Sequence, residues 1–244
     1  MPTLKESRAE LGAFGAWLGG SAQADLQEWY RNGNSEEEEA LTGMLCGLLV
    51  AKQPRPGKAD NPAAHGLDVA VVHKKNEEYL LGADLAIVFE SRIPHWELRT
   101  RTLLQAKRAE PGQRMRTREW QRMHAQARTM LRHVRESFVL AYSLEEESCV
   151  FPALSAASCG SRDLFDLDWY SFQGFMEGIF CGFIGEALGE EEGGGEPGGR
   201  KRSLARHEIR ILVRQEQPGD LGGSRPPTPV DPVGGQRVAE AAWQ

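Results

Sequence analysis

Two segments of this chain, residues 82–90 and 103–108, have the pattern of β-strands that carry polar groups near one end. In the second segment Gln105 and Lys107 are two residues apart, and because side chains alternate between the faces of a strand, both lie on the same face. Asp84 opens the first segment. If the two strands pair, a carboxylate, an amide and an ammonium group meet at one end of the pair. We therefore expect a fold that contains a sheet with a polar site on it.

This combination of groups is what metal-dependent phosphodiester cleavage requires. The Asp84 carboxylate and the Gln105 amide oxygen suit a hard divalent cation such as Mg²⁺ or Mn²⁺. Lys107 would face the anionic phosphate or an attacking water. The pattern indicates a hydrolytic site in which the metal acts as a Lewis acid.

A helix predicted to begin at Ser35 adds a second acid. The segment from Ser35 to Glu38 reads as a capping box, with acids in the first turn where the helix dipole favours them. Its apolar stripe starts at Leu41, and Glu38 lies three residues earlier on the same side of the helix. We expect Glu38 to face inward.

The spacing of apolar residues predicts that helices and strands alternate along the rest of the chain. Residues 3–31 are predicted to form two short helices separated by Gly19 and Gly20. Further helices are predicted at 120–134 and 169–188, and strands at 67–74, 79–90, around Gln105, at 137–143, at 149–156 and, as an edge strand, at 207–215. This order predicts an α/β fold with a mixed central sheet flanked by helices.

Composition divides the chain into four parts. Residues 1–34 would form N-terminal helices that pack on the core, and residues 35–188 would form the core with an apolar helix at its C-terminal end. Residues 189–203 are rich in Gly and Glu, which cannot bury a core, and they are predicted to form a flexible linker. Residues 204–244 would hold the edge strand and a disordered tail.

Several functional classes lack their sequence signatures. No stretch of eighteen apolar residues and no signal-peptide pattern occurs, which predicts a cytoplasmic protein that does not enter a membrane. The four cysteines are widely spaced and form no CxxC pair, so we expect reduced thiols. The chain has no HExxH, GxGxxG, GxxxxGK[ST] or GxSxG motif. Zinc hydrolases, common nucleotide-binding loops and serine nucleophile elbows are therefore disfavoured.

Positive charge is concentrated next to the predicted site. The whole chain has a formal net charge of −6. Residues 91–135, in contrast, contain twelve Lys and Arg against three Glu, a local balance of +9. A basic segment of this kind attracts a polyanion, although a solvated basic helix with no ligand is the alternative.

The order of these elements, from the helix with Glu38 to the strands at 149–156, resembles the PD-(D/E)XK, or restriction-endonuclease-like, nuclease superfamily. The resemblance covers residues 35–156 and rests on Gly82-Ala83-Asp84 and Gln105-Ala106-Lys107. It implies a restriction-endonuclease-like core in which Glu38, Asp84 and Gln105 bind the metal and Lys107 completes the catalytic set.

The pattern is similar to a variant found among stand-alone bacterial members. In that variant a helix glutamine and a methionine four residues later follow the lysine strand, and a later strand ends in tyrosine. Gln126, Met130 and Tyr142 match these positions. The resemblance implies that Gln126 contacts a nucleotide or braces the site. Among the basic residues, Arg108 and Arg122 are the expected nucleic-acid contacts.

The chain departs from the family pattern at two positions. Gln105 stands where an acid is usual, which leaves metal binding more dependent on Asp84 and Glu38. Ala83 stands where proline is usual. The resemblance implies a magnesium-dependent DNA endonuclease, plausible as an effector of antiphage defence, with a protein partner for targeting or restraint and homo-oligomerisation left open. Two alternatives remain: a degenerate nuclease fold that binds nucleic acid or acts as a scaffold, and an RNA nuclease.

Overall fold

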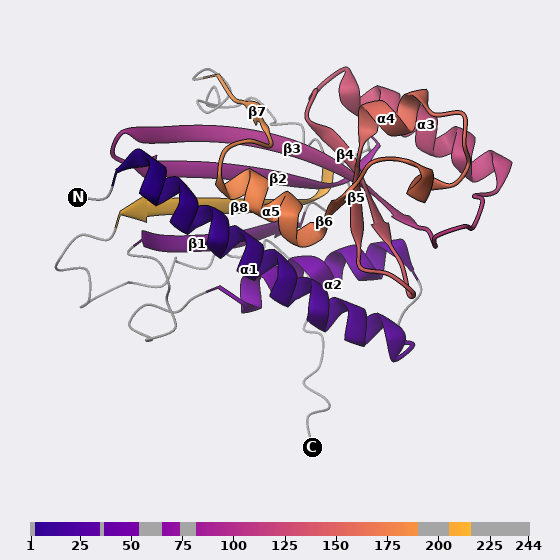
Figure 1. Ribbon diagram of the computed structural model, residues 1–244, viewed down its shortest axis with the longest axis horizontal. Coiled ribbons are helices and arrows are strands. Elements are labelled where there is room, and N and C mark those ends of the chain that lie inside the picture. The colour runs from indigo at the N-terminus through magenta and orange to yellow at the C-terminus, as the bar shows by residue number, and fades with distance from the viewer. Residues whose placement is uncertain (1–2, 35–36, 54–64, 74–81, 190–204, 216–244) are drawn as a thin grey trace, which may run out of the picture.

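A computed structural model describes residues 3–34, 37–53, 65–73, 82–189 and 205–215. Within these residues eight strands form one mixed sheet, with helices on both faces (Figure 1). The predicted α/β class with a mixed sheet flanked by helices is confirmed. The order across the sheet is β1-β8-β2-β3-β4-β5-β6, and the short β7 pairs with β3.

The strands and helices alternate only in part along the chain. The described strands are β1 (His65–His73), β2 (Ala83–Ile93), β3 (Trp96–Arg108), β4 (Ser137–Tyr142), β5 (Cys149–Pro152), β6 (Tyr170–Ser171), β7 (Glu186–Ala187) and β8 (Ala205–Gln215). The helices are α1 (Leu4–Arg31), α2 (Glu38–Ala51), α3 (Thr117–Leu131), α4 (Ala153–Ser158) and α5 (Phe172–Phe180), with a 3₁₀ turn at Leu164–Asp166.

The centre of the sheet is a long antiparallel hairpin of β2 and β3. Its register pairs Leu85 with Leu104 and Ile93 with Trp96. The two strands are joined by a two-residue turn at Pro94 and His95. His95 has a φ of 68°, the left-handed conformation that a type II turn with proline at the preceding position requires. The long paired strands bring Asp84 and Gln105 to the same end of the hairpin.

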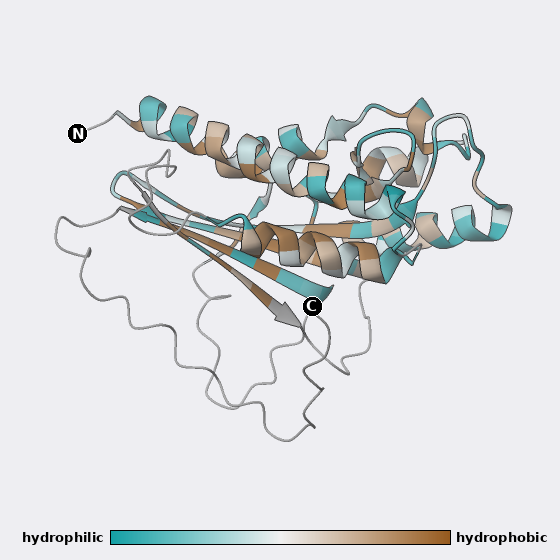
Figure 2. Cartoon of the chain, turned by 90° about the horizontal axis from the view of Figure 1, so that it is seen from below, coloured by the Kyte–Doolittle hydropathy of each residue, from teal (hydrophilic) through white to brown (hydrophobic). Residues whose placement is uncertain are grey.

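One face of the sheet, called here the α1 face, is covered by α1, α2 and α5. Its core combines leucines of α1 and α2 with the phenylalanines of α5 and alternate residues of the strands. Figure 2 shows the strands mostly hydrophobic and α1 banded in both colours, as expected for an amphipathic helix that packs one side on a sheet. This face holds the largest part of the apolar core.

The prediction of two short helices in residues 3–31 is wrong, because α1 is one continuous helix of 28 residues. Its glycines are contact points for α5. A Cβ atom at Gly15 would lie 2.8 Å from Phe180 Cβ, and one at Gly19 would lie 2.8 Å from Met176 Cγ. The glycines let two helices approach closely, so the pair at 19–20 does not break the helix.

The predicted helix over 169–188 is also too long. The helix α5 covers only Phe172–Phe180, and the chain then turns at Gly182 and Gly185, whose φ values are 70° and 118°. These conformations favour glycine and redirect the chain so that β7 can pair with β3. Tertiary pairing therefore ends a helix that apolar spacing alone would extend.

Three smaller predictions need correction. The helix α2 begins at Glu38, and its N-cap is Glu37 with no side-chain capping bond, while the expected cap residue Ser35 lies outside the described residues. The strand predicted at 149–156 ends at Pro152, where α4 begins. The strand at 205–215 is not an edge strand, because β8 lies between β1 and β2, antiparallel to the first and parallel to the second.

The opposite face, called here the α3 face, is covered by α3 and α4 over β3, β4 and β5. Next to β2 its core consists mainly of small residues, among them Ala83, Ala86 and Ala127. Under β4 and β5 it is larger and includes Trp120 and Phe151. Asp84, Gln105 and Lys107 lie among these residues, at the end of the hairpin.

The four cysteines are unpaired thiols. Burial raises the pKa of Cys46 and of Cys149 to about 12, so these two thiols stay protonated at neutral pH. No helix in the described ranges is both long and apolar enough to cross a membrane. The predicted linker and most of the predicted tail lie outside the described residues.

Candidate functional site

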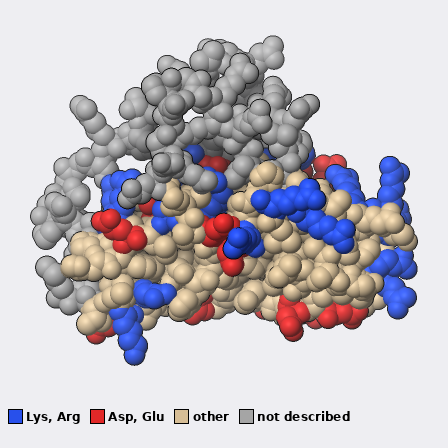
Figure 3. Space-filling model, turned by 90° about the horizontal axis from the view of Figure 1, so that it is seen from above, with Lys and Arg blue, Asp and Glu red and all other residues tan. Residues whose placement is uncertain are grey.

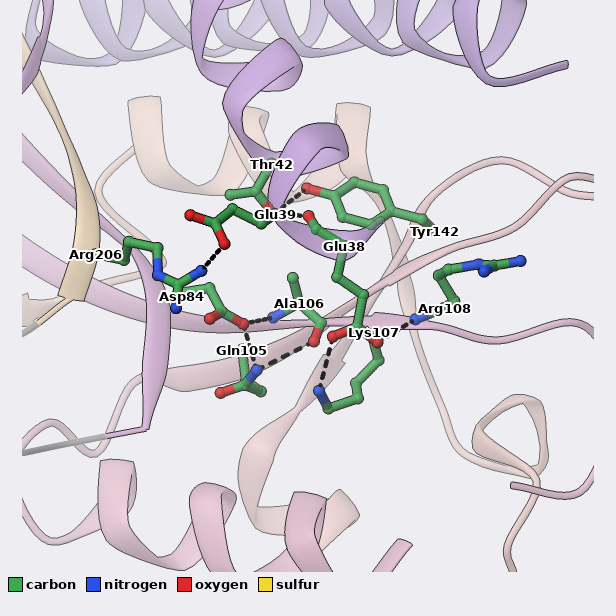
Figure 4. Close-up of polar contacts among 10 residues, drawn as sticks. All are labelled: Glu38, Glu39, Thr42, Asp84, Gln105, Ala106, Lys107, Arg108, Tyr142 and Arg206. Carbon is green, nitrogen blue, oxygen red and sulfur yellow. Dashed lines mark hydrogen bonds and ion pairs between the residues drawn. The ribbon is translucent and has the colours of Figure 1, made fainter. Parts of the chain in front are cut away.

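The site is built where β2 begins and β3 ends (Figure 4). Asp84 Oδ2 accepts a hydrogen bond from the Ala106 backbone N at 3.0 Å and another from Gln105 Nε2. The same Gln105 Nε2 donates to the Ala106 carbonyl oxygen at 3.1 Å. Asp84 and Gln105 are 21 residues apart in sequence and in direct contact because the hairpin register places them opposite each other.

Glu38 and Lys107 form a second polar pair beside the first. Lys107 Nζ lies 3.0 Å from Glu38 Oε2, and the Arg108 backbone N donates to Glu38 Oε1 at 3.2 Å. Lys107 is only 4% exposed, so its charge needs this partner. The first turn of α2 thus extends a carboxylate over the end of β3, as the helical spacing from Leu41 predicted. The structure brings together all four of the predicted catalytic residues.

Burial controls the protonation of Asp84. Loss of water raises the pKa of its carboxyl group above the ordinary value, and the hydrogen bond from Ala106 N and the charge of Lys107 offset part of this effect. A carboxylate perturbed mainly by desolvation and placed next to a lysine is typical of functional sites.

The contacts that hold α2 against β4 could not be found from the sequence, although Tyr142 itself was among the residues singled out there. Tyr142 is fully buried and donates from its hydroxyl to Thr42 Oγ1 at 3.1 Å. Thr42 Oγ1 in turn donates to the Glu38 backbone oxygen at 2.8 Å. These two bonds fix the first turn of α2 against β4. The Thr42 contact has a weak sequence signal, since a threonine four residues after Glu38 can bond back to it.

The N-terminal helix also contributes to this end of the molecule. Arg108 Nε donates to the Tyr30 hydroxyl at 3.0 Å, which holds the Arg108 side chain against the end of α1. On the other side Arg206 of β8 forms an ion pair with Glu39. Nothing in the sequence pattern singles out Tyr30, Glu39 or Arg206, because their partners are far away along the chain.

Two clefts flank the polar residues. One has a volume of about 340 Å³ and lies between the start of β2 and α3, with Asp84, Arg122, Gln126 and Arg206 on its walls. The other, of about 530 Å³, begins at Glu38 and Arg108 and is lined by three arginines of the chain between residues 108 and 116. The site thus opens on both sides into clefts with guanidinium groups.

Gln126 is positioned by a glycine. Gly82 has a φ of 70°, and a Cβ atom there would lie 3.1 Å from Gln126 Cγ. The Gln126 side chain can therefore rest on the backbone just before Asp84. Its Oε1 atom is buried and has no hydrogen-bond partner among the described residues.

The basic segment separates into two groups in space. Arg92 and Arg99 lie toward the far end of the hairpin and pair with Glu90, at 2.6 and 3.8 Å. Near the site, in contrast, exposed arginines have no ion-pair partner among the described residues. They are Arg114, Arg116, Arg118 and Arg122. Figure 3 shows Lys and Arg side chains gathered at the end of the molecule where α3 lies.

The donor atoms at the site suit a sparsely ligated cation. Within the described ranges, no three His, Cys, Asp or Glu side chains are grouped so that they could hold a metal ion. The Gln105 Oε1 atom, however, is buried without a hydrogen-bond partner among these residues. Together with Asp84 it offers two oxygen ligands, which suits Mg²⁺ because this ion keeps several waters. Both Glu38 oxygens accept hydrogen bonds in this arrangement, from Lys107 Nζ and from the Arg108 backbone N, and the predicted metal-binding role of Glu38 stays a prediction.

Comparison of the chain with protein-family models, with curated proteins and with solved structures found no match.

Proposed function

We propose that this protein is a magnesium-dependent phosphodiesterase that cleaves DNA, with a core of the restriction-endonuclease-like type. One observation carries the proposal. Asp84, Gln105 and Lys107 converge with Glu38 at the end of the β2–β3 hairpin, where the two clefts lined by arginines begin. An acid, an amide and a lysine between clefts that carry guanidinium groups suit a phosphodiester substrate.

Each residue has a distinct role in the proposed reaction. Asp84 and Gln105 would hold Mg²⁺, which supplies Lewis-acid activation of the phosphate and of a water molecule. Lys107 would stabilise the negative charge that develops on the phosphate oxygens. Glu38 would hold the Lys107 ammonium group in place, since its Oε2 atom lies 3.0 Å from Lys107 Nζ.

The arginines favour a nucleic acid over a small phosphate ester. Arg122 stands in the cleft on the Asp84 side, and Arg114 and Arg116 stand in the cleft on the Glu38 side. A strand that crosses the site could therefore contact guanidinium groups on both sides of the scissile phosphate. Such contacts position the backbone and make binding depend on salt concentration.

A second candidate function is a catalytically inactive nucleic-acid-binding subunit. The amide nitrogen of Gln105, not its oxygen, faces Asp84, and the Glu38 carboxylate is already paired. In this arrangement the polar groups satisfy one another, as a structural network would. Metal binding by Asp84 and Gln105 requires the Gln105 amide to rotate so that Oε1 turns toward the ion.

Cleavage of plasmid DNA by the purified protein in Mg²⁺ separates the two functions. We expect cleavage that EDTA abolishes, and a loss of about a hundredfold or more in Asp84→Asn and in Lys107→Met. Asp25→Asn and Lys52→Met are matched controls, because this second acid–lysine pair, 2.7 Å apart, joins α1 to the end of α2 away from the site. The controls should cleave normally.

Binding measurements complete the design. Mg²⁺ titration by calorimetry should give weaker binding for Asp84→Asn than for Asp25→Asn. DNA binding without cleavage, unchanged by Mg²⁺, would contradict the nuclease and support the binding subunit. The same assay with labelled RNA tests the nucleic acid: faster cleavage of RNA than of DNA would overturn the choice of DNA.

A further inference from the structure

A third cleft lies away from the proposed site, where the turn between β4 and β5 meets α1 and α5. Its volume is about 320 Å³. The walls are formed by Glu145, Glu146 and Glu147 of the turn, by Gln23, Gln27 and Arg31 of α1, and by Gln173 of α5. In Figure 1 the β4–β5 turn reaches the C-terminal half of α1. We call this cleft the acidic pocket.

The charges of the acidic pocket are not balanced within it. Its three exposed glutamates and one arginine leave a net charge of −2. None of the three glutamates has an ion-pair partner among the described residues. Arg31 donates from Nε to the Leu144 carbonyl oxygen at 3.2 Å. The pocket is thus net negative, which disfavours a nucleic acid as its ligand.

The turn that carries the glutamates is held in one conformation. Gln27 Nε2 donates to the Ser143 and Leu144 carbonyl oxygens at 3.0 and 3.1 Å. Ser143 Oγ accepts from the Glu146 backbone N at 2.9 Å, and Glu110 accepts from the Leu144 backbone N at 2.8 Å. The backbone of the turn is thereby tied to α1 and to the end of β3, so the glutamates are displayed on a fixed base.

A buried amide provides an independent sign of a ligand. Gln23 is 6% exposed, and its Oε1 atom is buried without a hydrogen-bond partner among the described residues. An unsatisfied buried acceptor costs about 1–3 kcal/mol, so it is rarely retained without a use. Gln23 lies in the wall of the same pocket as the glutamates. The wall of the pocket therefore contains an acceptor that lacks a donor.

We propose that the acidic pocket binds a guanidinium-bearing ligand, such as an arginine side chain or a small free guanidine. A guanidinium has five N–H donors in one plane, which can meet the carboxylates and the Gln23 oxygen together. It is also more weakly hydrated than an ammonium group. Its removal from water on entering a half-buried pocket therefore costs less free energy. A divalent metal is disfavoured, because the glutamates are not grouped as a metal site in the described part of the chain.

Calorimetry with the full chain tests this inference independently of nuclease activity. The probes are N-acetyl-arginine methylamide, the corresponding lysine derivative, a capped tri-arginine peptide, spermidine and Mg²⁺. We expect the arginine derivative to bind at least tenfold more tightly than the lysine derivative. The triple variant Glu145→Gln, Glu146→Gln and Glu147→Gln should weaken this binding at least tenfold, and Gln23→Leu should weaken it severalfold.

The chain provides a matched control in a second run of three glutamates at 190–192. The corresponding triple Gln variant removes the same charge and should bind as the parent does. Equal loss in both triple variants would reduce the effect to net charge and overturn the proposal. Three further results would overturn the proposal. They are equal affinity for the lysine derivative or spermidine, binding of Mg²⁺ without binding of the arginine derivative, and no binding of the arginine derivative at millimolar concentration.

Comparison of the tri-arginine peptide with the single arginine derivative identifies the source of the ligand. Tighter binding of the tri-arginine peptide than of the single arginine derivative indicates a basic segment of a protein partner. Equal affinity indicates a small free guanidine. A thermal melt of each variant monitors folding. If the fold is intact, Gln23→Glu should bind the arginine derivative more tightly than Gln23→Leu, because it adds a negatively charged acceptor.

Discussion

The two faces of the central sheet differ in what they bury. The α1 face buries phenylalanines and leucines in one large apolar cluster. The α3 face, at the end of the same hairpin, buries small alanines together with Gln105 and Lys107, which are 2% and 4% exposed. The difference shows how a strand can serve two purposes. Large apolar side chains on one face stabilise the hairpin, and polar side chains on the other face are held in place by it.

In strand β3 the apolar and the polar side chains alternate between the two faces residue by residue. Leu104 and Ala106 point into the α1 face, while Gln105 and Lys107 point into the α3 face. Burial of a lysine costs free energy, and the ion pair with Glu38 offsets this cost only in part. We infer that the stability of the sheet comes mainly from the α1 face, and the following predictions test this division.

The largest effect is expected from Phe180→Ala on the α1 face. The Phe180 ring is fully buried, and its centroid lies 5.6 Å from that of Phe14 and 5.2 Å from that of Phe89. Its truncation should cost about 3–5 kcal/mol of unfolding free energy, measured by urea denaturation. Phe183, which is 76% exposed, is the matched control, and Phe183→Ala should cost less than about 1 kcal/mol. Equal losses would contradict the division.

A smaller effect is expected from adding one methyl group between α1 and α5. In Gly15→Ala the new Cβ would meet the Met176 backbone oxygen at 2.8 Å, so the helices must separate. We expect a loss of about 1–3 kcal/mol in thermal or urea unfolding. In Gly47→Ala on α2 the new Cβ meets nothing within 4 Å, and the same change should stabilise by about 0.5–1 kcal/mol. Stabilisation by both changes would show that α1 and α5 do not pack closely.

The smallest effect concerns the pH dependence of stability on the α3 face. Burial raises the pKa of Asp84, so the folded state keeps this proton to higher pH than the unfolded state. The stability contributed by the group is therefore fully present below its ordinary pKa and is lost as pH rises through its raised pKa. Asp84→Asn cannot titrate, so its stability should improve relative to the parent across this window and then level off. A constant difference at all pH values would mean that Asp84 has an ordinary pKa.

Part of the fold could be predicted because it depends on local pattern. The strands around Asp84 and Gln105 have period-2 alternation, and the inward position of Glu38 follows from its spacing to Leu41. The corrections arise where a residue acts on a distant partner. Gly19 and Gly20 read as a break, yet Gly19 faces Met176, and the chain after Phe180 leaves the helix in order to pair with β3.

The candidate site shows the same limit. The sequence supplied the four polar residues, but it did not show that the Gln105 amide nitrogen faces Asp84, or that both Glu38 oxygens are already bonded. It also did not reveal the third cleft, whose glutamates and Gln23 are more than a hundred residues apart. Such contacts depend on register and on helix packing, which have no local signature.

The sequence by itself determined which chemical groups are available and on which face of a strand or helix each one lies, because alternation and helical spacing are properties of the backbone. Tertiary structure alone decided which of these groups meet. The hairpin register brings Asp84 to Gln105, α2 brings Glu38 to Lys107, and α1 brings Gln23 to the acidic turn. The physical reason is that burial of the apolar faces fixes the relative positions of the elements, and the polar groups are carried with them.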